Sequence, residues 1–398
     1  MKIRRTFVCG AVAASALAFA AGPAVAQTVR VGLINTYSGP MASNGDQIEK
    51  AINLFMKLGE CKLPPGVNLE IIKRDDTGIN PETAKRLAQE LIVRDKVQLL
   101  TGVVWTPNAM AMAPLATEAK VPFVIMNAGT AMITTLSPYI ARTSFTLWQS
   151  SYPMGTWAAK KFKTAFVAVA DFGPGHDAQE AFTRAFTAGG GQVVGTVRMP
   201  PPTLDFAPFL QRVKDAKPEA LFVFIPAGKS ATGLMKGFGD LGLDKAGIKL
   251  IGPGDVTDDV ELPNMGDVPL GVITMFHYSA AGDRPANKAF VAAYKKEYGP
   301  NAWPNFISVG AWDGMTAICD VVRAQGGKVD PDKTMLLLRG WKNPNSPRGP
   351  IEIDPLTRDI IQNEYVREVR KVGGNLANVE LETFTAVKDP WKEINKKQ

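Results

Sequence analysis

Residues 97–130 read VQLLTGVVWTPNAMAMAPLATEAKVPFVIMNAGT, and this stretch decides the fold. Its pattern predicts a strand over residues 97–101, a helix over 109–119 and a second strand over 122–126, with a polar loop after each strand. The first loop carries Thr106 and the second carries Thr130. Open parallel sheets bind ligands at the carboxyl ends of their strands, where helix N-termini offer unpaired N–H groups. These two loops are therefore the first candidates for a binding site.

The alternation of strand and helix extends towards the N-terminus of this stretch. Residues 29–34 form an apolar β-type run, and residues 46–58 carry apolar side chains at helical spacing. After a second alternating run, Asn80 is expected to cap a helix that has Pro81 in its first position. Strand–helix units repeated in this way predict an α/β fold with a parallel, doubly wound sheet.

A second series of strand–helix units begins after Arg142. Its clearest strands are AFVAVA at residues 165–170 and ALFVFI at residues 220–225, with helical patterns between them. A chain of 398 residues exceeds the size at which a single hydrophobic core keeps growing. The sequence therefore predicts two Rossmann-like lobes.

The N-terminal segment has the pattern of a secretory signal. Lys2, Arg4 and Arg5 precede an apolar run from about Phe7 to Ala21, and the cleavage pattern Ala24-Val25-Ala26 follows it. The run is shorter than the roughly 20 residues that a membrane-spanning helix needs, so we expect residues 1–26 to be cleaved and the protein to be periplasmic. Arg4 and Arg5 also fit the core of a twin-arginine signal, and the sequence leaves the export route open.

The net charge argues against one class of partner, and the cysteines raise the question of a disulfide. Loss of the signal lowers the formal net charge from +7 to +4, and no basic stripe with interleaved aromatic residues follows, so a nucleic-acid partner is not expected. Cys61 and Cys319 remain. Whether they form a disulfide stays open, because the sequence does not show how close their Cα atoms lie.

Motifs for catalysis are not found. A nucleophile elbow, G-x-S-x-G, does not occur, and residues 228–230 (GKS) lack the first glycine of a phosphate-binding loop because Val223 stands in its place. His176 and His277 are isolated from the cysteines, without the spacing of metal ligands. We therefore expect no enzyme activity, no cofactor and no metal.

Four segments in order carry a family resemblance. They are GLINTYSGP at residues 32–40, RDD at 74–76, DFG at 171–173 and DRPANKAFV at 283–291. Together they resemble the leucine/isoleucine/valine-binding protein family, which comprises type I periplasmic solute-binding proteins of ABC transporters of the branched-chain amino acid type. The resemblance covers nearly the whole chain after the signal.

The resemblance implies two α/β lobes that close on a ligand and are joined by three hinge crossings, near residues 142–145, 276–279 and 353–355. Lobe 1 would comprise residues 27–143 and 278–353, and lobe 2 residues 144–277 and 354–398. It also implies a small solute with a carboxylate and an ABC permease in the inner membrane as partners. A ligand sensor that signals through a receptor is the alternative, and a secreted enzyme using the same cleft is a further one.

The resemblance also assigns the carboxylate site. It places a hydroxyl residue at Thr106 and a run of small residues at Ala128, Gly129 and Thr130. The physics agrees, since a hydroxyl group and helix N-terminal amides give charge-assisted hydrogen bonds to an anion. A simple helix N-cap is the other interpretation of each threonine.

Aromatic residues are the next candidates, because binding pockets are commonly lined by aromatic side chains. Tyr37 follows the first strand, Trp105 lies in the carboxylate loop, and Phe172 takes the place of an aromatic residue that the family carries on the second lobe. Trp148 and Phe306 are weaker candidates. A core role is the alternative for Trp148.

The chain departs from the family pattern where amino-acid binders carry an acid for the ligand's ammonium group. The alignment puts Gly254 at that position, and Asp255 follows it. Either Asp255 substitutes for the family's acid or the ammonium site is lost. The second reading favours an aromatic carboxylate or another solute that is not an amino acid, since fold does not fix the ligand.

Overall fold

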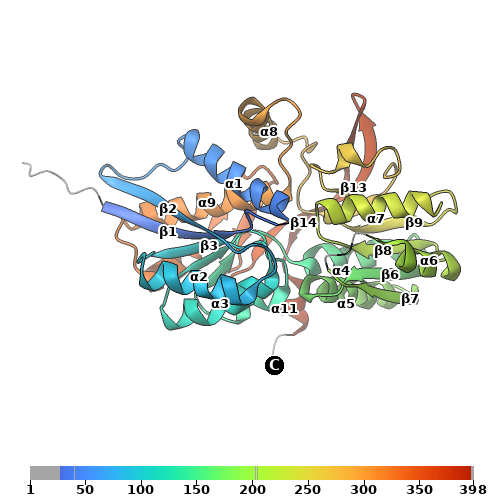
Figure 1. The fold of residues 1–398 in the computed structure, drawn as a ribbon, viewed down its shortest axis with the longest axis horizontal. Coiled ribbons are helices and arrows are strands. Elements are labelled where there is room, and N and C mark those ends of the chain that lie inside the picture. Colours follow the sequence, from blue (N-terminus) through green and yellow to red (C-terminus); the bar gives the residue numbers. More distant parts are fainter. Residues whose placement is uncertain (1–26, 40, 202, 204, 396–398) are drawn as a thin grey trace, which may run out of the picture.

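The computed structural model describes residues 27–39, 41–201, 203 and 205–395. The expected signal, residues 1–26, lies outside the described residues. Two α/β lobes stand side by side, the N-terminal elements in blue and cyan in one and the elements in green and yellow in the other (Figure 1). The predicted fold class is confirmed.

Lobe 1 is built on a five-stranded sheet in the order β2-β1-β3-β4-β5, and all its neighbouring strands are parallel. Its strands are β1 (Gln27–Asn35), β2 (Val67–Asp75), β3 (Leu99–Gly102), β4 (Phe123–Ile125) and β5 (Ile140–Arg142). Its helical elements are α1 (Ala42–Lys57), α2 (Pro81–Val93), α3 (Thr106–Glu118) and η1 (Ala131–Thr135), with α8 (Pro285–Tyr298), α9 (Phe306–Ala324) and α10 (Pro331–Leu338) from later in the chain.

Lobe 2 contains the parallel strands β7-β6-β8-β9-β10, extended by antiparallel strands from the C-terminal part. Its strands are β6 (Thr164–Ala170), β7 (Gln192–Met199), β8 (Ala220–Phe224), β9 (Lys249–Pro253), β10 (Ile273–Phe276), β13 (Ile360–Val372) and β14 (Asn375–Val387). Its helical elements are α4 (Leu147–Ala158), α5 (Gly173–Ala188), α6 (Ala207–Ala216), α7 (Lys229–Asp240), η2 (Gly254–Thr257) and η3 (Leu262–Asn264). Two short strands, β11 (Lys342–Asn343) and β12 (Ile351–Ile353), and the terminal helix α11 (Pro390–Ile394) complete the described elements.

Local sequence signals account for most helix starts. The Asn80 side chain accepts a hydrogen bond from the Thr83 N–H at 3.2 Å, and α2 begins at Pro81, as predicted. Helix α3 differs, since it begins at Thr106 and not at residue 109. Pro107 fits the first turn of a helix, where its missing N–H is not needed. The shift brings Thr106 into the helix and leaves Trp105 at the N-cap position, without a side-chain cap.

The chain passes between the lobes between β5 and α4 and again between β10 and α8, close to the expected crossings. The start of β13 pairs with β12, and its later residues pair with β10 of lobe 2. The third crossing near residues 353–355 and the lobe boundaries stay predictions.

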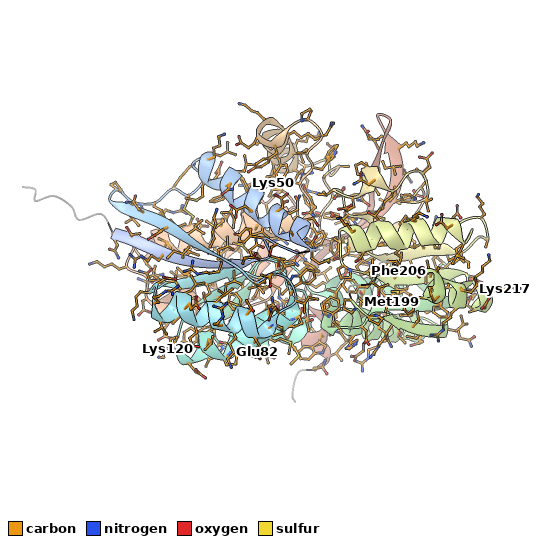
Figure 2. All side chains as sticks on the ribbon, in the orientation of Figure 1. Lys50, Glu82, Lys120, Met199, Phe206 and Lys217 are labelled. Carbon is orange, nitrogen blue, oxygen red and sulfur yellow. A yellow bond between two sulfur atoms is a disulfide. The ribbon has the colours of Figure 1, made fainter. Side chains whose placement is uncertain are left out.

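Apolar side chains lie in the core and charged side chains lie on the surface, as expected. Met199 and Phe206 are buried in lobe 2, whereas the charged residues Glu82, Lys120 and Lys217 are exposed (Figure 2). None of the helices that the structure describes has the length and apolar character to cross a bilayer.

The structure also answers the cysteine question. Cys61 and Cys319 are bonded, and their Cα atoms lie 5.4 Å apart. The bridge ties the segment after α1 to helix α9 across a sequence separation of 258 residues. It therefore joins two distant segments of lobe 1.

Candidate functional site

A small, partly open cavity lies between the lobes. Lobe 1 contributes the loops after β3 and β4, which carry Thr106 and Gly129. Lobe 2 contributes the loops after β6, β8 and β9, which carry Phe172, Pro226 and Asp255. The cavity thus lies at the carboxyl ends of both parallel sheets, the position at which this class of fold binds ligands.

Several helices begin at the cavity. The residues that line it include Asn44 of α1, Thr106 of α3, Leu147 of α4, Pro174 of α5 and Phe306 of α9, each within the first turn of its helix. Each helix N-terminus carries partial positive charge and unpaired N–H groups. Their convergence favours an anionic group in the cavity.

We call Thr106, Gly129 and Thr130 the threonine rim. The hydroxyl oxygens of Thr106 and Thr130 lie 3.0 Å apart, within hydrogen-bond distance. Neither threonine caps a helix with its side chain, because Thr106 is inside α3 and Thr130 makes no cap bond at η1. A Cβ added to Gly173 of lobe 2 would lie 2.8 Å from the Thr130 hydroxyl oxygen, so the start of α5 packs directly on the rim.

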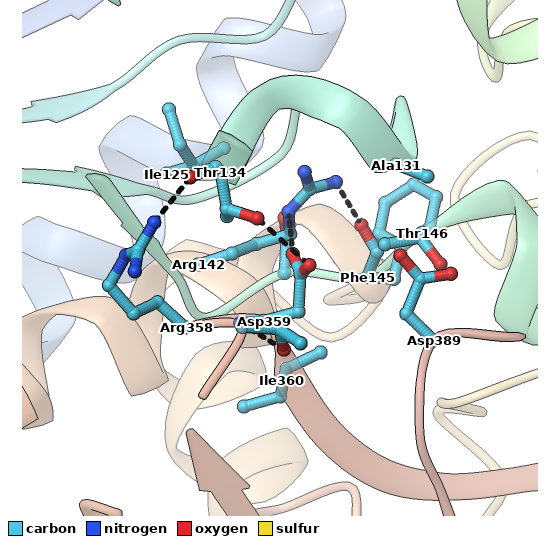
Figure 3. A network of polar contacts seen from close by, with 12 residues as sticks. Ile125, Ala131, Thr134, Arg142, Phe145, Thr146, Arg358, Asp359, Ile360 and Asp389 are labelled. Carbon is cyan, nitrogen blue, oxygen red and sulfur yellow. Dashed lines mark hydrogen bonds and ion pairs between the residues drawn. The ribbon is translucent and has the colours of Figure 1, made fainter. Parts of the chain in front are cut away.

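A buried ionic network supports the backbone of the rim, and Figure 3 shows its central pair, Arg142 and Asp359. The guanidinium of Arg142 donates to the carbonyl oxygens of Ala128 at 3.0 Å and Thr130 at 2.7 Å. It also forms an ion pair with Asp359 at 3.0 Å, and the ammonium group of Lys392 contacts the same carboxylate. Arg142 is fully buried. The loop is therefore positioned by its backbone, and the Thr106 side chain of the rim lines the cavity.

Aromatic rings form much of the remaining wall. Phe145 and Phe306 pack edge to face, with centroids 5.5 Å apart, and Phe172 stacks on Phe224 at 6.2 Å. All four line the cavity. Trp105 lines it too, and its indole N–H donates to the Thr36 hydroxyl at 2.9 Å, which fixes the ring against the end of β1. Such walls suit a planar apolar group.

Two acceptor atoms among the lining residues have no partner. They are Oδ2 of Asp255 and Oδ1 of Asn127. Burial raises the pKa of the Asp255 carboxyl to about 7, although the nearby Arg367 lowers it. The Asn127 amide group donates to the Val104 carbonyl oxygen at 2.9 Å, which leaves its own oxygen unpaired. The cavity therefore holds acceptors that lack donors within the protein.

The structure brings together six of the predicted site residues around this cavity: Trp105, Thr106, Gly129, Phe172, Asp255 and Phe306. Tyr37 is not among the lining residues, because its hydroxyl donates to Glu49 at 2.9 Å. Trp148 is fully buried and stacks on Tyr152 at 6.2 Å, which is the core role. Ala128 and Thr130 also do not line the cavity and stand behind it. Their roles in ligand binding stay predictions.

Sequence reasoning missed Asn44, Asn127, Phe145 and Phe224, which also line the cavity. Phe224 ends a strand that the sequence predicts, and Phe145 lies at an expected crossing, so the strand-end rule and the hinge positions were usable signals. Asn44 had no signal, because only the packing of α1 against lobe 2 brings it there. Its amide nitrogen reaches the Ala227 carbonyl oxygen of lobe 2 at 3.4 Å.

His277 lies at the second crossing, where its ring stacks on Phe145 at 5.1 Å. Burial lowers its pKa well below the usual value, and Arg348 and Arg367 act in the same direction. His176 is instead exposed and contacts Asp171 at 2.8 Å. Within the part of the chain that the structure describes, no group of three or more His, Cys, Asp or Glu residues is arranged to hold a metal ion.

Comparisons with known proteins agree with this geometry. A model of the periplasmic binding protein family matches residues 28–374. A Leu/Ile/Val-binding protein homolog 6 from Brucella melitensis is 44% identical over 382 residues, which cover 95% of this chain and 97% of the relative.

Two solved structures are similar in sequence and fold. One is a solute-binding protein of an ABC transporter from Rhodopseudomonas palustris BisB5 in complex with 3,4-dihydroxybenzoic acid, with 51% identity, a TM-score of 0.88, and coverage of 92% of this chain and 99% of that one. The other, from Rhodopseudomonas palustris HaA2, is in complex with p-hydroxybenzoic acid, with 45% identity, a TM-score of 0.88, and coverage of 93% and 100%.

The family that the four sequence segments indicated is thus confirmed over most of the chain. The fold, with ligand-side loops from two lobes, is the one that this family uses to enclose a solute. The chain belongs to the periplasmic binding protein family, and it is a solute-binding protein of the Leu/Ile/Val-binding group that serves ABC transporters.

Proposed function

We propose that this protein captures an aromatic carboxylate of the benzoate type in the interlobe cavity. The observation that carries the proposal is the combination of converging helix N-termini with walls of paired aromatic rings. The first feature favours a carboxylate, and the second favours a flat ring. Two relatives with 51% and 45% identity hold hydroxylated benzoic acids, which supports the same ligand class.

In this proposal the ligand carboxylate contacts the Thr106 hydroxyl and the first turns of the helices at the lobe 1 side. The ring lies between Phe145 and Phe306 on one side and Phe172 and Phe224 on the other. Contacts from both lobes exist only when the lobes meet, so the ligand would favour the closed state of a hinge motion.

A ligand panel tests the proposal. Purified protein without residues 1–26 would be screened by thermal shift and then by calorimetry against benzoate, benzamide, cyclohexanecarboxylate and leucine. Benzamide removes the charge and cyclohexanecarboxylate removes the flat ring, so benzoate should bind more tightly than both. At 100 times its Kd, a ligand should add about 2.7 kcal/mol to the free energy of unfolding. Tight binding of leucine without binding of benzoate would contradict the proposal.

Delivery to a permease and export to the periplasm complete the function. Residues 1–26 would direct export and be removed, so N-terminal sequencing of the protein from the periplasm should begin at Gln27. The loaded protein should stimulate ATP hydrolysis by its ABC permease in reconstituted membranes. A receptor that responds to the loaded protein while no permease does would favour the sensor instead.

A further inference from the structure

The starting point is the unpaired carboxylate oxygen in the cavity. Asp255 is 5% exposed, and its Oδ2 has no hydrogen-bond partner. A buried charged acceptor without a donor is more unfavourable than a neutral one. An occupant of the cavity that carries a donor at this point would remove that penalty.

The nearest cation does not serve as that donor. The guanidinium of Arg367 donates to the Thr274 hydroxyl at 3.0 Å and to the Tyr278 carbonyl oxygen. Its place is fixed, because a Cβ added to Gly254 would lie 2.1 Å from Arg367 Nη2. The positive charge thus stands close to Asp255 but is already bonded to other groups.

This arrangement separates two kinds of donor. An ammonium group of a ligand at Asp255 would compete for this carboxylate with Arg367, which does not line the cavity but already interacts with Asp255 and with Asp259. A neutral hydroxyl group adds no second positive charge and needs a single acceptor. The wall therefore suits a hydroxyl donor better than an ammonium group.

Charge also orients the ligand. A carboxylate is repelled by Asp255 in its ionised form and is attracted by the helix N-termini and the Thr106 hydroxyl on lobe 1. The ligand's carboxylate should therefore lie at the threonine rim, and the opposite end of its ring should point to lobe 2.

We propose that Asp255 accepts a hydrogen bond from a ring hydroxyl group at the end of the ligand away from its carboxylate, and so selects hydroxybenzoates over benzoate. This inference rests on the proposed function. Asp255 thereby acts as the specificity-determining residue of the cavity, in place of a partner for an amino-acid ammonium group.

Calorimetry with matched ligands tests the wild-type protein. We expect 3-hydroxybenzoate or 4-hydroxybenzoate to bind at least about tenfold more tightly than benzoate, since a site built for a hydroxyl group strongly rejects the analogue that lacks it. The size control is 4-methylbenzoate, whose methyl group is close to a hydroxyl group in size but is not a donor, and which should not show the gain. Equal affinities for benzoate and both hydroxybenzoates would overturn the inference while leaving the proposed function intact.

Variants of Asp255 test whether this residue causes the preference for hydroxybenzoates. Asp255→Ala should lower the affinity for the preferred hydroxybenzoate about 10–100-fold more than the affinity for benzoate, and Asp255→Asn, which keeps an acceptor oxygen, should lower it less. The matched control is Asp171→Asn, an exposed acid of lobe 2 outside the cavity, which should keep the wild-type ratio. If Asp255→Ala keeps that ratio too, the inference is wrong.

Two further outcomes distinguish a failure of this inference from a failure of the proposed function. Binding of leucine or phenylalanine that is lost in Asp255→Asn would overturn the inference and assign Asp255 to an ammonium group. If no aromatic acid binds the wild-type protein, the proposed function itself fails, and the inference fails with it.

Discussion

The two sides of the cavity are built in different ways. On lobe 1 the threonine rim is held by its backbone, through the buried Arg142, and its loop carbonyl groups are hydrogen-bonded. On lobe 2 the Asp255 carboxylate has an unpaired oxygen and a pKa raised to about 7 by burial. The backbone hydrogen bonds of the rim fix its geometry, whereas the ionisable, unpaired oxygen of Asp255 responds to what enters. The unpaired acceptor on lobe 1, Asn127 Oδ1, belongs to a neutral amide. We infer that lobe 1 sets the position of the carboxylate and lobe 2 sets which carboxylate is accepted.

The largest effect is expected from breaking the support of lobe 1. Arg142→Met leaves the Ala128 and Thr130 carbonyl groups without their donor and removes one of the cations that pair with Asp359. Loss of one partner of a buried ion pair typically lowers the free energy of unfolding by about 3–5 kcal/mol. Urea unfolding followed by circular dichroism measures it.

The matched control for this prediction is Arg198→Met. Arg198 is 44% exposed and lies 3.9 Å from Asp171, and exposed ion pairs contribute only about 0–1 kcal/mol. An equal loss of stability in both variants would show that the buried network does not support the rim.

Removal of the disulfide should give the next largest effect. Cys61→Ser combined with Cys319→Ser should lower the free energy of unfolding by roughly 2–5 kcal/mol. Neither cysteine lines the cavity, so the affinity of the folded protein for its ligand should stay near that of the wild type. Thermal unfolding with and without reductant, paired with calorimetry, checks both parts. A large loss of affinity at unchanged stability would contradict the prediction that the disulfide stabilises the fold without positioning the ligand site.

A smaller effect is expected at the rim itself. Thr106→Ala removes a hydroxyl group that lines the cavity, and loss of a hydrogen bond to a charged group should weaken carboxylate binding by about 1–3 kcal/mol. Thr130→Ala should weaken it less, since Thr130 stands behind Thr106. Thr135→Ala is the control, because its exposed hydroxyl donates to the Met132 carbonyl oxygen outside the cavity. Unchanged affinity in both rim variants would remove the rim from the site.

The smallest effect concerns pH and the contact between the lobes. Asp177 of α5 accepts a hydrogen bond from the Ala131 N–H of lobe 1 at 2.7 Å. Burial raises the pKa of Asp177 to about 7, Asp389 raises it further, and Arg142 lowers it. A carboxyl whose pKa is raised in the closed form holds its proton better there than when hydrated. Closure therefore becomes less favourable as the pH rises from the ordinary Asp pKa of about 4 to about 7, and it changes little above that value.

Ligand affinity should accordingly fall by up to about tenfold between pH 6 and pH 8. Asp177→Asn should reduce this slope, because the variant side chain does not titrate. Calorimetry across this range measures the slope. An affinity that rises with pH would contradict the assignment of the pKa shift to closure.

The fold and the lobe 1 side of the site could be predicted from the sequence. Strand–helix periodicity predicted the parallel sheets, the strand-end rule placed the loops of Thr106 and Thr130 next to each other, and Asn80 with Pro81 marked the start of a helix. These features depend on neighbours in the chain or on general rules of sheet topology. Both can be recognised from the order of the residues alone.

Side-chain directions and contacts between distant segments became visible only in the folded chain. The tertiary structure turned Tyr37 towards Glu49, buried Trp148 in the core, joined Cys61 to Cys319 and brought Asn44 to the cavity. It also showed that Arg367 fills the space beside Gly254, over a hundred positions away in the chain. Side-chain direction and contacts between distant segments depend on how helices pack across lobes, and no local pattern in the sequence records that packing.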